Sequence, residues 1–169
     1  MKKEIYRQGD VGVERVSEIP ATAKKQRHKK RILLVQGAAT GHEHSFDVSQ
    51  VTAFVDEGGA QFFKVTGKKL KFRLPLEKQE EKLIRKQALV VHPKLGKIAF
   101  RIADVRIEDN HAIVDGTFAA LSHLDSASLK PSTDHAAQGI PTGLYRGASF
   151  IGTVRQSQYS PQEVRRVQD

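Results

Sequence analysis

Short stretches in which apolar and polar residues alternate, separated by turns that contain glycine, constrain the fold of this chain most. In residues 69–74, the apolar side chains of Leu70, Phe72 and Leu74 alternate with lysine and arginine. Successive side chains of a β-strand point to opposite faces, so this pattern predicts a strand with one buried face. Similar stretches recur, about eight or more in all, and predict an all-β sandwich or barrel.

Turn sequences join several of these predicted strands. Residues 51–55 and 61–65 flank the sequence Asp-Glu-Gly-Gly, which favours a hairpin because glycine tolerates a positive φ. Residues 108–111 predict a second hairpin turn. Residues 122–139 are rich in serine, aspartate, proline and small residues, so they predict a long loop.

Two stretches differ from the strand pattern and predict short helices. Residues 77–87 consist largely of strong helix formers. Near the C-terminus, Ser160 and Glu163 form a capping box with Pro161 at the first helical position. We therefore expect one or two short helices, the last at the C-terminus.

The bulk composition limits the chain to a few classes of protein. Its 169 residues predict a single β-rich domain, residues 1–169. The absence of cysteine excludes disulfides, thiolate metal sites and a cysteine nucleophile. We see no signal peptide, no apolar run long enough to cross a membrane, no GxSxG elbow and no P-loop. We expect a cytoplasmic protein, either free or associated with a virion or a ribonucleoprotein.

The charge is strongly basic, with 28 Lys and Arg against 19 Asp and Glu and a net charge of +9. Such a balance favours a polyanionic partner, above all nucleic acid, whereas the alternative is a basic surface that only keeps the protein soluble. Residues 24–31 would be a phosphate-binding arm or a mobile hairpin loop. The basic face of residues 69–73 would bind phosphates or form an ordinary solvated edge. The candidate nucleic-acid-binding residues are Lys24, Lys25, Arg27, Lys29, Lys30, Arg31, Lys69, Lys71 and Arg73.

A histidine pair is the candidate metal site. His42 and His44 are two residues apart, so on a strand they share one face and present two imidazoles to one ion. Three neutral imidazoles suit zinc, iron or nickel, and zinc or iron is the expected cofactor. The alternative is a pair that makes only structural hydrogen bonds. We expect His135 as the third ligand, and the alternates are His92, His123 and Asp47.

The histidine pair resembles the first motif of the cupin superfamily, which binds metal in a β-barrel. Asp47 stands near the place of the cupin glutamate, and Pro141 and Gly143 match the start of the second cupin motif. Arg146 stands where that motif has a histidine. The resemblance implies a cupin-like, metal-dependent enzyme acting on a small molecule.

The chain also resembles a family of small, largely uncharacterised bacterial and phage proteins. The matching motifs are RQGDV at residues 7–11, TGHEH at 40–44, Asp-His at 134–135, PTGLY at 141–145 and the C-terminal 155–169. This resemblance implies a β-rich fold and a histidine site, with His92 competing with His135. It also implies an insertion at about 68–130, between the matching parts.

We therefore expect a non-enzymatic accessory or assembly protein. It would bind RNA, DNA or another anionic partner, with a protein assembly partner as a further expectation and no membrane. The histidine cluster would be an ancillary metal site. The alternative is the cupin-like metal-dependent enzyme.

Overall fold

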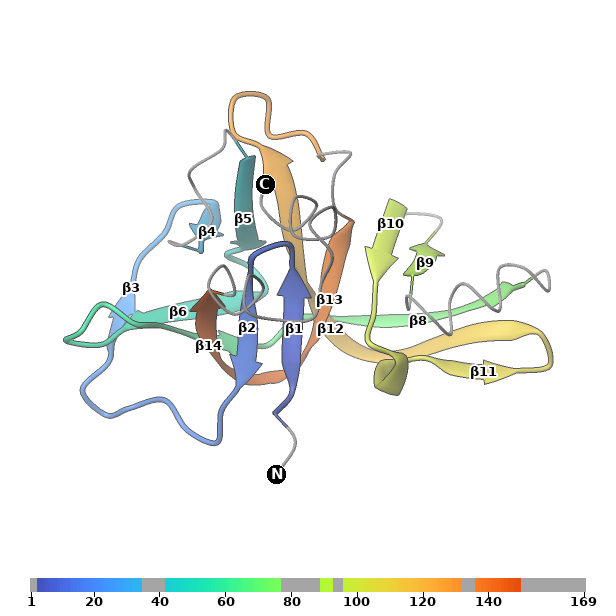
Figure 1. Cartoon of the computed structure of the whole chain (residues 1–169), viewed down its shortest axis with the longest axis horizontal. Coiled ribbons are helices and arrows are strands. Elements are labelled where there is room, and N and C mark those ends of the chain that lie inside the picture. The colour runs from blue at the N-terminus through green and yellow to red at the C-terminus, as the bar shows by residue number, and fades with distance from the viewer. Residues whose placement is uncertain (1–2, 35–41, 77–88, 93–95, 132–135, 150–169) are drawn as a thin grey trace, which may run out of the picture.

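The fold is all-β and consists of two sheets packed together, as Figure 1 shows. The structure is a computed structural model that describes residues 3–34, 42–76, 89–92, 96–131 and 136–149. Over these residues the strands form no closed barrel, and the helical content is one short 3-10 turn, η2 (Ile102–Asp104). The all-β prediction is confirmed in its sandwich form. Both predicted α-helices lie outside the described residues.

The first sheet has six strands, and all its neighbours are antiparallel. It brings the two ends of the described chain together, because β14 pairs with β2 on one side and β7 on the other. The basic strand β3 forms one edge. In spatial order the strands are β1 (Ile5–Gln8), β2 (Val11–Arg15), β14 (Gly143–Ser149), β7 (Gln61–Val65), β6 (Val51–Val55) and β3 (Lys24–Gln26).

The second sheet has eight strands and includes one parallel pair, β10 with β13. A long strand of 15 residues, β12, runs through it and pairs with β8 along its first half and with β5 near its end. The path is β4 (Arg31–Leu33), β5 (His42–Asp47), β12 (His111–Asp125), β13 (Ala137–Pro141), β10 (Gly96–Ala99) and β9 (Leu89–His92), while β8 (Lys68–Pro75) and β11 (Arg106–Glu108) pair with β12.

One loop prediction is wrong in its bounds. Residues 122–139 do not form a single loop, because β12 continues to Asp125 and β13 begins at Ala137. The strand continues because Ser122 pairs with Ser45 on β5, and the pairing extends to the end of β12. Backbone pairing therefore outweighs the polar composition of this stretch.

The predicted hairpin turns are confirmed. The strands β6 and β7 pair along their full length, and Gly59 between them has a φ of 85°. Between β11 and β12, Asp109 and Asn110 have φ values of 48° and 58°. Two successive residues with positive φ are typical of the type I′ turn that suits a two-residue hairpin.

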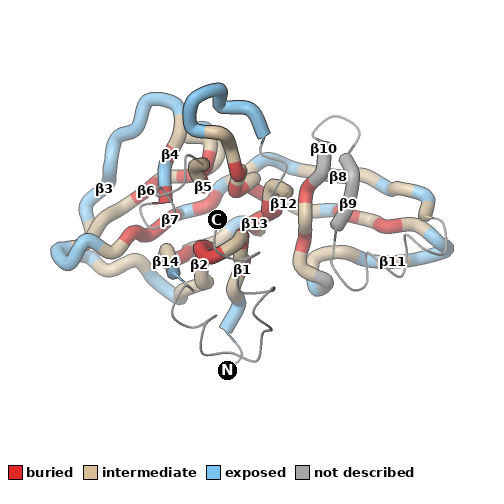
Figure 2. Tube along the Cα trace, turned by 45° about the horizontal axis from the view of Figure 1, so that its top comes forward, coloured by how far each residue is buried: buried red, intermediate tan, exposed pale blue. Residues whose placement is uncertain are grey.

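The apolar residues gather in two clusters, and Figure 2 shows buried segments inside the sheets and exposed segments at β3 and beyond β12. The first cluster lies between the sheets and includes Phe46 and Phe63, whose ring centres are 5.3 Å apart. The second cluster lies against β8 and includes Phe100 and Phe118, 5.1 Å apart. Figure 1 shows the strands that carry both clusters. That the chain is a single domain with an insertion at about 68–130 stays a prediction.

Candidate functional site

Three histidines meet where β5 begins and β12 ends. His42 and His44 share one face of β5, and His123 on β12 lies directly opposite His44 in the strand register. The ring centres of His44 and His123 are 4.6 Å apart, and those of His42 and His123 are 4.9 Å apart. His44 and His123 are almost completely buried. Of the predicted ligands, the structure thus brings His123 to the pair.

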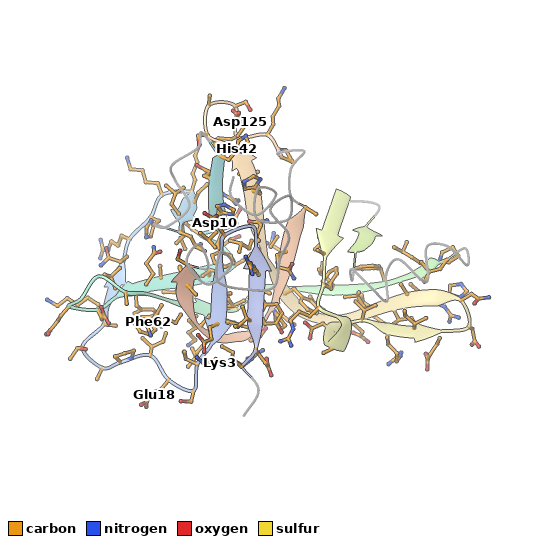
Figure 3. All side chains as sticks on the ribbon, viewed as in Figure 1. Lys3, Asp10, Glu18, His42, Phe62 and Asp125 are labelled. Atoms are coloured by element: carbon orange, nitrogen blue, oxygen red, sulfur yellow. The ribbon has the colours of Figure 1, made fainter. Side chains whose placement is uncertain are left out.

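The local sequence explains this placement. On β5, the face that carries His42 and His44 continues to Phe46, which belongs to the apolar cluster between the sheets. On β12, the face that carries His123 continues from Leu121 of the same cluster. The three imidazoles therefore lie on the faces of β5 and β12 that point into the core, where apolar side chains are usual. Figure 3 shows His42 where β5 begins, with Asp125 of β12 beside it.

Gln8 connects this histidine cluster to the first sheet. Its Nε2 donates to the carbonyl oxygens of Leu121 (2.9 Å) and Ala136 (2.8 Å). Both amide hydrogens are thus used, and Gln8 Oε1, 2.9 Å from His44 Nδ1, must be the acceptor. His44 therefore carries a proton on Nδ1, and in the neutral ring Nε2 holds the lone pair.

The other predicted ligands are placed differently. Asp47 is turned away, because its carboxylate accepts hydrogen bonds from the backbone N–H (2.8 Å) and the hydroxyl (2.6 Å) of Ser49. These bonds lower the pKa of Asp47. The backbone of His92 lies on β9, and β13 and β10 separate that strand from β12. His135 lies outside the described residues.

The carboxylate beside the histidines is also engaged. Asp125 is opposite His42 in the register, and it accepts hydrogen bonds from the backbone N–H groups of Ala127 (3.0 Å) and Ser128 (2.9 Å). The bonds from Ser128 are the main reason that the pKa of Asp125 is lowered. As the rings stand, the described part of the chain has no group of three or more His, Cys, Asp or Glu side chains arranged to hold a metal ion.

The predicted basic arm is largely exposed and is partly a strand. Lys24 and Lys25 lie on the edge strand β3, and the basic residues that follow, as far as Lys30, are exposed as well. Arg31 differs, because its guanidinium donates to the hydroxyl oxygen (2.9 Å) and the carbonyl oxygen (3.0 Å) of Ser45. Arg31 is thus held against β5.

The second basic stretch lies on the exposed face of β8. Lys69, Lys71 and Arg73 are exposed, while the apolar residues between them pack against the second cluster. In the register with β12, Lys71 is opposite Asp115. An acidic residue therefore offsets part of the positive charge of this face.

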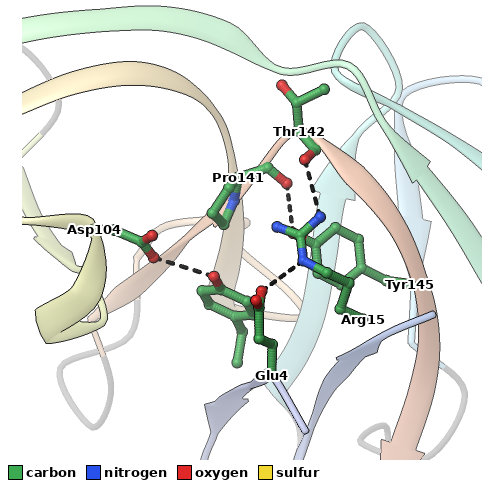
Figure 4. Close-up of polar contacts among 7 residues, drawn as sticks. Glu4, Arg15, Asp104, Pro141, Thr142 and Tyr145 are labelled. Atoms are coloured by element: carbon green, nitrogen blue, oxygen red, sulfur yellow. Dashed lines mark hydrogen bonds and ion pairs between the residues drawn. The ribbon is translucent and has the colours of Figure 1, made fainter. Parts of the chain in front are cut away.

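A partly buried polar cluster that sequence reasoning missed joins β1, β2, β14 and η2 (Figure 4). The Tyr6 hydroxyl donates to Asp104 (3.2 Å), and the Tyr145 hydroxyl donates to the Pro141 carbonyl (2.7 Å). Arg15 lies over the Tyr145 ring, 5.0 Å from its centre. Burial raises the pKa of Tyr145 above its usual 10.0, and burial also raises the pKa of Asp104. Tyr6 and Asp104 are 98 residues apart, so no local pattern could have indicated the pair.

The model of one protein family, described as Domain of unknown function (DUF8820), matches residues 7–102. This stretch is more than half of the 169 residues, so the chain belongs to that family. The match includes the RQGDV and TGHEH motifs and the first part of the predicted insertion, and it ends before β12. No curated protein and no solved structure matches the chain. Its described residues include no helix long and apolar enough to cross a membrane.

Proposed function

We propose that this member of the family is a non-enzymatic accessory protein that binds nucleic acid through exposed lysine and arginine side chains. We also propose that it belongs with the small bacterial and phage proteins that share its motifs, and that it works in the cytoplasm. The observation that carries it is the exposure of the lysine and arginine side chains in residues 24–30, the part of the predicted arm before Arg31, which we call the basic arm. The net charge of +9 is consistent with a polyanionic partner.

Within the part of the chain that the structure describes, the cations of the basic arm form no ion pair. Among the described residues, the ion pairs join Lys3 to Glu14, Arg15 to Glu4 and Arg106 to Glu108. None of these pairs includes a cation of residues 24–30. Exposed cations without an internal acidic partner are available to phosphates, and their binding would release counterions from the nucleic acid.

The chemistry of this surface favours contacts with phosphates over contacts with bases. The large apolar residues exposed in the described part of the chain are Leu33 and Leu129, and neither is aromatic. Recognition of single-stranded bases typically uses exposed aromatic rings for stacking. Lysine contacts to phosphates carry no sequence information, so we expect binding that depends little on base sequence.

The face of β8 is the second part of the proposed surface. It carries three exposed cations, but Asp115 opposite Lys71 reduces its net charge. Figure 1 places β3 and β8 on different sides of the molecule. We therefore assign the larger share of the affinity to the basic arm.

The test is the salt dependence of binding to labelled single-stranded RNA, single-stranded DNA and duplex DNA, measured by fluorescence anisotropy. The triple variant Lys24→Ser, Lys25→Ser and Arg27→Ser should flatten the slope of log K against log salt by about 2 for a single strand, because each lost phosphate contact removes roughly 0.7. Arg31 is left in place because it bonds Ser45.

A matched control removes the same charge from elsewhere on the surface. Lys64, Lys130 and Arg146 are also exposed. Their change to serine should leave the slope of log K against log salt close to that of the unmodified protein. Equal slopes for the two triple variants, or no binding at low salt, would refute the proposal. A preference among the three nucleic acids would identify the natural partner.

The cupin-like enzyme is less well supported by the geometry. The described strands form two sheets without closing a barrel. Arg146, at the position of the second cupin motif, is exposed on β14 of the first sheet, whereas the histidine cluster lies on β5 and β12 of the second. The histidine cluster is the feature that still supports the cupin-like alternative.

A further inference from the structure

We propose that His42, His44 and His123 bind one divalent transition-metal ion, with zinc as the preferred ion, and that Gln8 positions His44 for this role. The site is independent of the nucleic-acid surface, because it lies where β5 begins and β12 ends and uses none of the exposed cations. It differs from the first choice of the sequence analysis, which has His135 as the third ligand and His123 as an alternate.

The spacing of the rings suits a shared ion. Two imidazoles bound to one zinc ion at roughly 2.0–2.1 Å hold their ring centres about 5 Å apart in a tetrahedral site. The ring centres of His123 and its two neighbours are 4.6 Å and 4.9 Å apart. The three side chains come from adjacent, paired strands, so the backbone already holds them at this spacing.

The rings must turn for an ion to bind, because the described residues show no ready set of three donors. The torsion that turns an imidazole about its own bond is broad and has a low energy cost. Binding would therefore need a change of ring orientation at His42 or His123 and no movement of the strands. His42 is only half-buried, so its side chain is less enclosed than those of His44 and His123.

Gln8 determines which nitrogen of His44 is the donor. Its amide is fixed by the carbonyls of Leu121 and Ala136, so Oε1 accepts the Nδ1 proton of His44. The lone pair is then on Nε2. An outer hydrogen bond that sets the tautomer and the ring orientation is a common feature of histidine ligands, and its loss typically costs 10–100-fold in metal affinity.

The donor set indicates the kind of ion. Neutral imidazoles suit zinc, iron and nickel, whereas magnesium and calcium require oxygen ligands. The carboxylate opposite His42 in the register, Asp125, is engaged in a turn, and Asp47 at the other end of β5 is engaged in another. We therefore expect zinc to bind and magnesium not to bind.

The experiment is a zinc titration of the full, untagged chain after treatment with a chelator, followed by calorimetry and by mass spectrometry of the metal content. We expect one zinc ion per chain and a higher melting temperature with zinc than with chelator, because an ion that binds only the folded state stabilises it. Magnesium should have neither effect. A zinc stoichiometry far below one, or an equal response to magnesium, would overturn the proposal.

Two ligand variants and a control assign the site. His42→Gln and His123→Gln should each lower the zinc affinity at least 10-fold, whereas His28→Gln changes an exposed histidine of the basic arm and should not. If His123→Gln fails to fold, His42→Gln decides the matter alone, because His42 is half-buried. Unchanged zinc affinity in His42→Gln would refute the assignment. Neither variant should alter the salt dependence of nucleic-acid binding, so the two proposals can fail separately.

One test distinguishes a Gln8 that sets the tautomer of His44 from a Gln8 that only stabilises the fold. Nitrogen NMR of the metal-free protein should show the proton of His44 on Nδ1, and Gln8→Leu should shift that proton toward Nε2. The same variant should weaken zinc binding 10–100-fold. A proton on Nε2 in the unmodified protein would exclude the positioning role.

Discussion

Gln8 on β1 and His44 on β5 belong to different sheets, and a 2.9 Å hydrogen bond between Oε1 and Nδ1 joins their side chains. The bond connects a residue of the RQGDV motif to a residue of the TGHEH motif, and these two residues are 36 positions apart in the chain. Both motifs fall within the stretch that the family model matches. Their shared role is thus to hold one polar cluster inside an otherwise apolar interior.

We predict that Gln8→Leu destabilises the protein by about 3 kcal/mol. Leucine has a similar volume but removes three hydrogen bonds, and it leaves buried carbonyl oxygens without their donor, at a cost of roughly 1 kcal/mol for each bond. Urea unfolding with a chelator present isolates this effect from metal binding. As a control, Gln138→Leu removes only a long 3.4 Å bond and should cost less than about 1 kcal/mol. Equal losses in the two variants would contradict the prediction.

Two glycines with positive φ should respond differently to alanine. Gly67 (φ 68°) would place a Cβ 2.6 Å from the backbone of Phe118, whereas a Cβ at Gly59 (φ 85°) would meet nothing within 4 Å. Both changes carry backbone strain of about 1 kcal/mol, but only Gly67→Ala adds a clash with backbone atoms. We expect Gly67→Ala to cost about 3 kcal/mol or more, measured by thermal unfolding. The idea fails if Gly59→Ala is as damaging.

Much of the fold could be predicted because alternation and turn chemistry are local. The strands 51–55 and 61–65 have the predicted bounds, and the hairpin turn at 108–111 is where the sequence indicates it. The alternation of residues 69–74 also correctly predicts β8 with one face against the core. In each of these cases, neighbouring residues carry the whole signal.

The histidine site was harder to predict because its third member occupies a core position with a polar side chain. His123 continues the alternating series of Ala119 and Leu121, which could have extended the predicted strand, but its polar neighbours indicated a loop. The role of Gln8 depends on contacts with residues 36, 113 and 128 positions away. Such contacts come from the packing of the sheets, which no local pattern describes.

The second apolar cluster should depend strongly on Phe100. Its ring is almost completely buried, and its centre lies 5.1 Å from that of Phe118 and 6.3 Å from that of Phe72. Phe100→Ala should therefore cost about 3–5 kcal/mol, the range for a large cavity in a core. The comparison is Leu33→Ala, an apolar residue that is 43% exposed and should change stability by about 0.5 kcal/mol or less. Similar effects in urea unfolding would argue against this cluster as a packed core.

The buried Tyr145 hydroxyl should make the protein sensitive to alkaline pH. Burial raises the pKa of Tyr145 above 10.0, the value expected in the unfolded chain. Above pH 10 the unfolded chain therefore loses a proton that the folded protein retains, and stability falls with rising pH by up to about 1.4 kcal/mol per pH unit. Below pH 10 both states keep the proton, so this contribution is complete.

Tyr145→Phe isolates that effect. At pH 8 the variant should be about 1 kcal/mol less stable, because it lacks the hydrogen bond to the Pro141 carbonyl. Between pH 10 and 11 the difference should shrink or reverse, since phenylalanine has no proton to lose. Tyr6, whose pKa is also raised by burial, remains in both proteins and affects them alike. Urea unfolding at pH 8, 9, 10 and 11 measures the difference, and a constant gap across these pH values would show that Tyr145 is not linked to the alkaline loss of stability.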